Sequence, residues 1–426
     1  MTVLAAAALL AWAYLLLAHG HFWQAGPALP PARAPSSPPV DVVVPARDEA
    51  DGIGATLQSL LAQDYAGPLR IIVVDDGSTD GTGAIARSLM PAAISPLRHC
   101  EARSAGAIQE PQDRAAGPGG PGIAAPQPQP ALTHGSEHPP ADASAGTREL
   151  LVLDGRPRPV GWSGKMWAVA QGVAETRATL ILLTDADILH APGHISTLVA
   201  KADRDGLDLV SEMVELRCHS PAERALVPAF VFFFQMLYPF ARVNDPTNAT
   251  AAAAGGTMLL RRRALDRIGG IAAIRGALID DVALAVAVKR GGRIWLGHGT
   301  LARSLRPYPG AADIWRMVAR TAYVQLRHSP VILAGTVAGL ALVWLAPPAL
   351  ALFGHGPARW MGALAWAGSA ASYLPTLHRF RQFPAWALAL PGIACFYMAA
   401  TLGSAWDHHR GRGAVWKRRT YRSAEA

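Results

Sequence analysis

The sequence predicts an α/β domain with a mostly parallel sheet flanked by helices, joined to an N-terminal anchor helix and to C-terminal transmembrane helices. Three short apolar runs, at residues 40–44, 71–74 and 180–183, each end in a polar cluster, and helical spacing follows the first two. Buried strands that alternate with helices are typical of a parallel sheet. Long apolar stretches lie at both ends of the chain, so the α/β domain is expected between them, at residues 40–328.

Residues 1–20 are predicted to form a transmembrane anchor. Residues 2–18 are almost entirely Ala, Leu, Val, Trp and Tyr, which is close to the minimum needed to cross a hydrocarbon layer of ~30 Å as a helix. A cleaved signal peptide is the alternative, but no positively charged residue precedes the apolar run. The Pro-rich residues 21–39 are expected to form a linker.

Residues 329–406 are expected to form a membrane domain, because they contain three further apolar stretches, at 331–353, 360–374 and 385–404. The number of spans stays open. The basic tail at 407–426 is expected to be cytoplasmic, whereas an anchor followed by three spans would place it outside. A re-entrant last stretch, broken at Pro391, or a first segment that does not cross would remove this conflict.

Two segments before the membrane domain have less certain surroundings. Residues 313–327 place apolar side chains on one helical face and arginines, Arg320 among them, on another, which predicts either an interfacial helix or an ordinary surface helix. Residues 225–241 are rich in phenylalanine and are expected to form buried core or an apolar acceptor site. Residues 91–147 lack apolar periodicity, and we expect a disordered insertion there.

The composition disfavours several classes of protein. The chain is 51% apolar and only 16% charged, against about 25% charged in soluble domains, so it is neither wholly soluble nor wholly disordered. The three cysteines are too far apart for a disulfide framework or a CxxC site, which favours a reducing, cytosol-facing catalytic domain. The chain lacks the P-loop and dinucleotide-binding motifs, which disfavours a P-loop nucleotidase and a dinucleotide-dependent oxidoreductase. It also lacks a Gly-x-Ser-x-Gly motif, and its histidines show no ligand spacing, which disfavours a serine hydrolase and a metal hydrolase.

Acidic pairs follow two of the predicted strands. Asp185 and Asp187 occupy alternate positions directly after residues 180–183, an arrangement that can hold Mg²⁺ or Mn²⁺ while leaving metal positions for a diphosphate. Asp75 and Asp76 follow residues 71–74 and can accept the N–H of a uracil, or they can simply form a turn. Lys165 follows a glycine and offers a point charge for a phosphate, although an ordinary surface lysine fits equally well.

A third acidic pair, Asp280 and Asp281, precedes an apolar helical run. A helix N-terminus favours ionised carboxylates, and an ionised carboxylate is what a general base requires. Simple capping of the helix is the competing interpretation.

Taken in order, Val44-Pro45-Ala46-Arg47-Asp48-Glu49, Val74-Asp75-Asp76-Gly77-Ser78, Gly164-Lys165, Asp185-Ala186-Asp187 and Asp280-Asp281 resemble the motifs of family 2 inverting glycosyltransferases with the GT-A fold. The segment at 161–165, the phenylalanine-rich stretch and residues 315–321 more narrowly resemble the hopene-associated glycosyltransferases, which are similar to ceramide glucosyltransferases.

This resemblance implies a membrane-bound transferase that moves one sugar from a nucleotide-sugar, most simply a UDP-sugar, to a lipid acceptor such as a hopanoid. It implies a bacterial cytoplasmic membrane location with the catalytic domain facing the cytosol. The implied roles are a nucleotide pocket with Arg320 nearby, a diphosphate contact at Lys165, a Mg²⁺ or Mn²⁺ ion on Asp185 and Asp187, and a base at Asp281 or Asp280. The implied pocket residues are Pro45, Arg47, Glu49, Asp75 and Asp76.

Two alternatives remain. A processive polysaccharide synthase is disfavoured because residues 317–321 lack the family's terminal tryptophan and its initial Gln or Arg. A non-catalytic membrane scaffold is disfavoured because both metal aspartates and the base are present.

Overall fold

The computed structural model of the chain describes residues 1–90, 146–411, 414–416 and 419–421. The predicted insertion at 91–147 lies almost wholly outside the described residues. The same holds for part of the basic tail, of which residues 414–416 and 419–421 form a two-stranded antiparallel pair, β9 (Ala414–Trp416) and β10 (Arg419–Tyr421).

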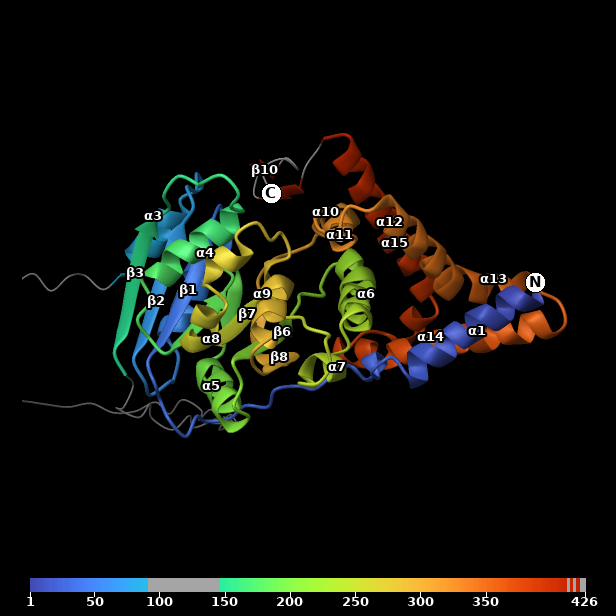
Figure 1. Cartoon of the computed structure of the whole chain (residues 1–426), viewed down its shortest axis with the longest axis horizontal. Helices are drawn as coiled ribbons and strands as arrows, with labels where there is room; N and C mark the ends of the chain where they lie inside the picture. The colour runs from blue at the N-terminus through green and yellow to red at the C-terminus, as the bar shows by residue number, and fades with distance from the viewer. Residues whose placement is uncertain (91–145, 412–413, 417–418, 422–426) are drawn as a thin grey trace, which may run out of the picture. The chain divides into compact units, whose positions relative to one another are not determined.

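Within the described residues, eight strands form one sheet in the order β3-β2-β1-β4-β7-β6-β8-β5 (Figure 1). The predicted strands at 40–44, 71–74 and 180–183 are present as parts of β1, β2 and β4. The strands are β1 (Val40–Ala46), β2 (Leu69–Asp75), β3 (Arg148–Asp154), β4 (Leu180–Thr184), β5 (Ile188–His190), β6 (Leu209–Glu215), β7 (Thr257–Arg261) and β8 (Ile294–Ser304).

The sheet is mixed, although six of its eight strands run in the same direction, as the prediction of a mostly parallel sheet requires. Strands β3, β2, β1 and β4 are parallel, as are β6 and β8, but β7 is antiparallel to both of its neighbours and β5 is antiparallel to β8. The chain leaves β6 into α6 (Pro221–Leu237) and α7 (Phe240–Asn244) and returns without crossing the sheet, so β7 runs opposite to β6. A pattern of apolar runs gives strand positions but does not give this return path.

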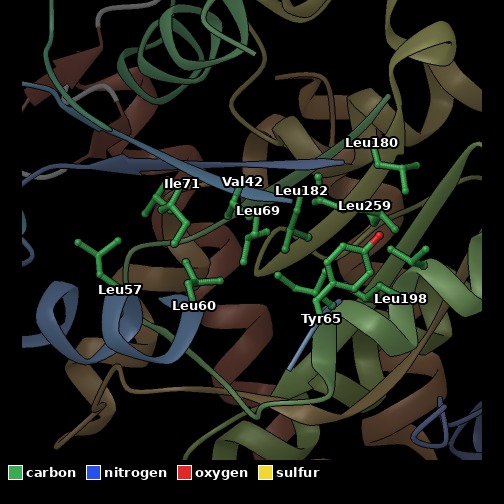
Figure 2. Packing of buried hydrophobic residues seen from close by; sticks show 14 of the residues in the cluster. Val42, Leu57, Leu60, Tyr65, Leu69, Ile71, Leu180, Leu182, Leu198 and Leu259 are labelled. Carbon is green, nitrogen blue, oxygen red and sulfur yellow. The ribbon is translucent and has the colours of Figure 1, made fainter. Parts of the chain in front are cut away.

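The sheet core forms where apolar side chains of the parallel strands meet helix α2 (Ala50–Leu61) and helix α5 (His194–Arg204). Figure 2 shows Leu57 and Leu60 of α2 pointing toward Ile71 and Val42 of the sheet. All four side chains are fully buried. Burying a side chain of this size stabilises the fold by about 1.5–3 kcal/mol, so the apolar runs in the sequence explain why these strands form.

Further helices place functional loops around the carboxyl ends of the parallel strands. Helix α4 packs on β1 and β2, and helix α9 packs on β8 (Figure 1). The short helix α3 follows β2, and α8 follows β7. Their bounds are α3 (Thr82–Ser88), α4 (Gly164–Ala174), α8 (Arg262–Arg267) and α9 (Asp280–Lys289).

The remaining helices pack on one another through a second apolar cluster that includes Trp12, Phe232, Trp344 and Tyr373. Helix α1 (Thr2–Leu17) lies along α14, and α10 and α11 pack on α15 (Figure 1). The others are α10 (Ala311–Ala319), α11 (Ala322–Gln325), α12 (Pro330–Leu340), α13 (Ala346–Phe353), α14 (Pro357–Arg379) and α15 (Leu390–His409), and the π-helical turn η3 (Ala341–Leu345) joins α12 to α13.

Among the described residues, one helical stretch is both long and apolar enough to cross a membrane. It is Pro330–Phe353, with a mean hydropathy of 1.9, whereas α1 is a shorter apolar helix of 16 residues. The anchor at residues 1–20 and the membrane domain at 329–406 therefore stay predictions. Pro391 lies in the first turn of α15, where proline is tolerated, rather than breaking a longer helix.

Candidate active site

A cavity of about 550 Å³ opens beside the carboxyl ends of β1 and β4. One end is polar and the other is lined by apolar side chains of α6, η3 and α15. The structure brings most of the residues expected in the site into this one cavity: Pro45, Arg47, Glu49, Lys165, Asp185, Asp187, Asp280, Asp281 and Arg320.

Asp75 and Asp76 are the exceptions, since neither lines the cavity. Asp75 ends β2 and is 9% exposed, and one of its carboxylate oxygens accepts hydrogen bonds from the backbone N–H and the hydroxyl of Ser78. Asp76 pairs with Arg47 at 3.6 Å. Asp76 therefore contacts Arg47, which lines the cavity, while Asp75 stabilises the turn that follows β2.

Lys165 joins two acidic groups that are far apart in the sequence. It lies in the first turn of α4, whose N-cap is Ser163. Its Nζ atom is 3.0 Å from Oδ1 of Asp185 and 3.0 Å from Oδ2 of Asp280. Burial alone would lower the pKa of Lys165, but the charges of Asp185 and Asp280 raise it above its usual value. The ammonium charge is therefore retained inside the site, and Lys165 is no ordinary surface lysine.

Asp281 has the environment of a base active near neutral pH. Its Oδ2 accepts a hydrogen bond from Gly255 N at 2.9 Å, and its Oδ1 accepts one from Val282 N at 2.8 Å. Burial first, and then the charge of Asp280, raise the pKa of Asp281 to about 7. A base is most effective when its pKa lies near the working pH.

The acidic pair does not cap helix α9. The N-cap residue is Ile279, which makes no capping hydrogen bond, and both aspartates lie inside the first turn. Asp280 faces Lys165 as an ion pair, whereas Asp281 is held by backbone N–H groups. The two neighbouring aspartates therefore have different partners. Among the ion pairs of the described residues, Asp280 has one with a cation and Asp281 has none.

Arg306 is a site residue that the sequence analysis missed. It follows β8, and its Nε atom donates to Oδ2 of Asp187 at 2.6 Å while Nη2 donates to Oε1 of Glu49 at 2.8 Å. The guanidinium thus holds two carboxylates from different loops. A single arginine between Leu305 and Pro307 has no recognisable spacing, so no sequence signal marked it.

Asp185 and Asp187 have the chemistry of a divalent-cation site that is completed by a ligand. Within residues 1–90 and 146–411, no group of three or more His, Cys, Asp or Glu side chains is placed to hold a metal ion. Two carboxylates nevertheless suffice for Mg²⁺ or Mn²⁺ when substrate phosphates and water supply the other ligands. Both carboxylates line the cavity, so the residues present fit such an ion.

The apolar end of the cavity is built mainly by α6, which contains the phenylalanine-rich stretch. Phe233 packs edge-on against Trp344 and Tyr397, with ring centroids 5.4 Å and 5.1 Å apart. Phe230, Phe234 and Leu237 line the same end. The predicted helix at 313–327 is interrupted at residues 320–321, between α10 and α11, and Arg320 lies at this break and lines the cavity.

The sequence of the chain matches known families of glycosyl transferases. The profile described as glycosyl transferase family 21 matches residues 148–424, which is more than half of the chain, and that of glycosyl transferase family 2 matches residues 41–108. An N-acetylglucosaminyltransferase of Azorhizobium caulinodans is 49% identical over 49 residues, and one of Bradyrhizobium elkanii is 50% identical over 44. These matches cover 11% and 10% of this chain, and the chain spans only 12% and 24% of those relatives.

Similar solved structures include a mannosyltransferase from Pyrobaculum calidifontis in complex with GDP-Man and Mn²⁺. It is 20% identical with a TM-score of 0.47, and the match covers 95% of this chain and 99% of that one. Another is S. aureus TarS in complex with UDP-GlcNAc, at 11% identity and a TM-score of 0.34, covering 88% and 93% of the two chains.

Proposed function

Since the chain belongs to glycosyl transferase family 21, we propose that it moves a single sugar from a UDP-sugar onto a hydroxyl group of a lipid in a bacterial cytoplasmic membrane. The family makes the chain a glycosyltransferase; the nucleotide-sugar donor, the acceptor and the location are the proposal. The observation that carries it is the single cavity, which joins a cluster of carboxylates to an apolar end. A hopanoid is the first acceptor to test.

The polar end is suited to a nucleotide diphosphate. Lys165 and Arg306 supply two positive charges there, and cations stabilise the charge that develops on a departing diphosphate. Asp185 and Asp187 would hold Mg²⁺ or Mn²⁺, which when bound adds further positive charge beside the phosphates. Arg47 and Glu49 line the same end and are expected to contact the nucleotide.

Asp281 is the proposed base. It takes the proton of the acceptor hydroxyl as the hydroxyl oxygen forms a bond to the anomeric carbon. The bond from that carbon to the diphosphate oxygen breaks in the same step, and UDP leaves with the electron pair. Attack from the face opposite the diphosphate inverts the anomeric centre. Gly255 N–H and Val282 N–H fix the carboxylate that receives the proton.

The apolar end is suited to the hydrocarbon part of the acceptor. Phe233, Trp344 and Tyr397 present aromatic surface there, while the acidic pair lies at the polar end. Val331, Phe353 and Trp360, on helices outside the sheet, are each more than 70% exposed. These exposed apolar side chains lie on or next to Pro330–Phe353, the stretch that is long and apolar enough to cross a bilayer, which supports a membrane-bound enzyme taking its acceptor from the bilayer.

The test uses the full-length protein purified in detergent, Mn²⁺, total bacterial membrane lipids, and radiolabelled UDP-glucose, UDP-N-acetylglucosamine or GDP-mannose. We expect label to pass from a UDP-sugar into the organic phase and the rate to fall without a divalent cation. Asp281→Asn is expected to transfer roughly 100-fold more slowly, because general-base catalysis contributes about 10²–10⁴-fold. Asp187→Ala is expected to be inactive both with and without the divalent cation.

The matched control is Asp51→Asn, an exposed aspartate in the first turn of α2, which is expected to behave like the unaltered protein. Label recovered in an aqueous polymer would indicate a polysaccharide synthase instead. Full activity in Asp281→Asn would refute the assigned base, and transfer that is independent of added lipid would refute the lipid acceptor.

A further inference from the structure

A row of buried polar side chains connects β6 to the end of β4, and the chemistry proposed above does not use it. Oε2 of Glu212 is 2.7 Å from Nε2 of His194, Nδ1 of His194 is 2.8 Å from Nδ1 of His190, and Nε2 of His190 is 3.2 Å from the Thr184 hydroxyl. All four side chains are at most 3% exposed. Titratable groups this deeply buried are rare unless they are paired.

The direction of every hydrogen bond in this row follows from its last member. The Thr184 hydroxyl lies 2.8 Å from the carbonyl oxygen of Gly256, and a carbonyl can only accept, so Thr184 donates to it. The hydroxyl has one proton, so its oxygen must accept from Nε2–H of His190.

Burial first, and then the neighbouring His194, hold the pKa of His190 well below its usual value, so this ring is neutral. Its Nδ1 is then an acceptor, and His194 donates to it through Nδ1–H. A single proton is shared between Nε2 of His194 and Oε2 of Glu212. Each polar atom from Nδ1 of His194 to the Thr184 hydroxyl therefore has one role only.

The row ends on the turn that holds the proposed base. The carbonyl of Gly256 accepts from the Thr184 hydroxyl and from the Asp185 N–H, the latter at 3.4 Å. The Ala254 N–H donates to the Ser211 hydroxyl at 2.8 Å. Between these two fixed points lies Gly255, whose N–H donates to Asp281. The orientation of the turn thus sets the direction of that N–H.

We propose that His190, His194 and Glu212 are positioning residues, which act through Thr184 and the turn at 254–256 to hold the carboxylate of Asp281 toward the acceptor hydroxyl. The inference rests on the proposed role of Asp281 as base. Neither histidine lines the cavity, and Glu212, which does, is only 1% exposed, so none of the three residues touches the substrate in this scheme. Their role is to give the Thr184 hydroxyl a fixed donor, Nε2–H of His190, so that the hydroxyl keeps the Gly256 carbonyl as its acceptor and has a single orientation inside the protein.

The experiment compares Thr184→Val, which keeps the shape but removes the hydroxyl, with Thr184→Ser, which keeps the hydroxyl. We expect kcat for transfer from radiolabelled UDP-glucose or UDP-N-acetylglucosamine to membrane lipids to fall roughly tenfold in Thr184→Val and to be restored in Thr184→Ser, since a net hydrogen bond is worth about 0.5–1.5 kcal/mol. The KM for the donor and the Mn²⁺ concentration for half-maximal rate are expected to stay the same.

A second pair of variants tests the far end of the row. In Glu212→Gln the amide can donate to Nε2 of His194, which keeps every bond in its direction, so kcat is expected to remain within about threefold of the unaltered protein. In Glu212→Leu this partner is lost, and kcat is expected to fall as in Thr184→Val. Asp41→Asn, which alters a buried carboxylate that accepts from Arg177 N and Ala178 N outside the row, controls for general destabilisation.

The decisive measurement repeats Thr184→Val in the Asp281→Asn background. If Thr184 acts through Asp281, the tenfold effect is expected to shrink to less than twofold there, because the group being positioned is gone. A full tenfold effect in both backgrounds would overturn the positioning role while leaving the base assignment intact. Unreduced transfer in Asp281→Asn alone would instead refute Asp281 as the base, and with it the role proposed here.

Discussion

Replacing Asp280 by asparagine tests which member of the acidic pair is the base. In the structure Asp280 forms an ion pair with Lys165, and its charge is the second cause, after burial, of the raised pKa of Asp281. The asparagine side chain would keep the size of the aspartate and remove its charge. The pKa of Asp281 is therefore expected to fall, and the variant is expected to stay active.

The size of the effect follows from the pKa of about 7 for Asp281. A base must be ionised, so activity is present above this pH and is lost as the pH falls through it. At pH 6 roughly one tenth of the molecules have an ionised Asp281. A neighbouring charge within ~4–6 Å moves a carboxyl pKa by about 1–3 units. A fall of about one unit would leave roughly half of the molecules ionised at pH 6, which is about five times more.

The assay is the rate of sugar transfer between pH 5.5 and pH 9, with each variant normalised to its own plateau. Asp280→Asn is expected to show its half-maximal rate at least about one pH unit below that of the unaltered protein, while the control Asp51→Asn keeps the original midpoint. A midpoint that does not move would refute the electrostatic argument. A loss of about 100-fold at every pH, with Asp281→Asn still active, would show that Asp280 is the base.

Two further predictions concern the two ends of the cavity. Arg306→Met removes the cation that holds Asp187 and Glu49. We expect kcat/KM for the donor to fall at least about tenfold, since charge-assisted hydrogen bonds are worth about 1.5–3 kcal/mol. Arg204→Met, at an arginine that is 60% exposed, is the control, and an equal loss there would contradict the role of Arg306. Phe233→Ala removes aromatic surface beside Trp344 and Tyr397. Titration with membrane lipids is expected to show a KM for the acceptor raised about tenfold and an unchanged KM for the donor. Phe383→Ala, at an exposed phenylalanine, should change neither KM, and a raised donor KM in Phe233→Ala would contradict an acceptor role for the apolar end of the cavity.

The parts of the fold that could be predicted are those with a local signal. Residues 40–44, 71–74 and 180–183 are short apolar runs that end in polar clusters, and they form three adjacent strands of the parallel part of the sheet. Strand β7 contains a similar short apolar run, at 258–260, but nothing in the run gives the direction of the strand. Its direction depends on where α6 and α7 return the chain, which is a tertiary property that apolar periodicity does not record.

The residues of the candidate site likewise include some that the sequence predicts and some that it does not. Asp185 and Asp187 could be chosen because they follow a predicted strand, Asp280 because it precedes an apolar helical run, and Lys165 because it follows a glycine in a motif of the family. Arg306 could not, because its partners lie more than 100 positions away in the sequence and no spacing links them.

The histidines show no ligand spacing in the sequence, and their contact arises from the fold. His190 ends β5 and His194 begins α5, so the bend between these elements brings two rings together that a straight strand or a continuous helix would present differently. Glu212 joins them only because β6 passes the start of α5. A buried row of this kind is visible only once the strands are placed beside one another.

Lys165 serves as the common counter-ion of Asp185 and Asp280, and this sharing makes the two halves of the reaction electrostatically dependent on each other. Its charge lowers the proton affinity of Asp281. A phosphate group arriving beside Asp185 would draw on the same ammonium, so less of its charge would act on the acidic pair, and Asp281 would bind a proton more strongly. Loading of the donor would in this way change the proton affinity of the base without any movement of the backbone.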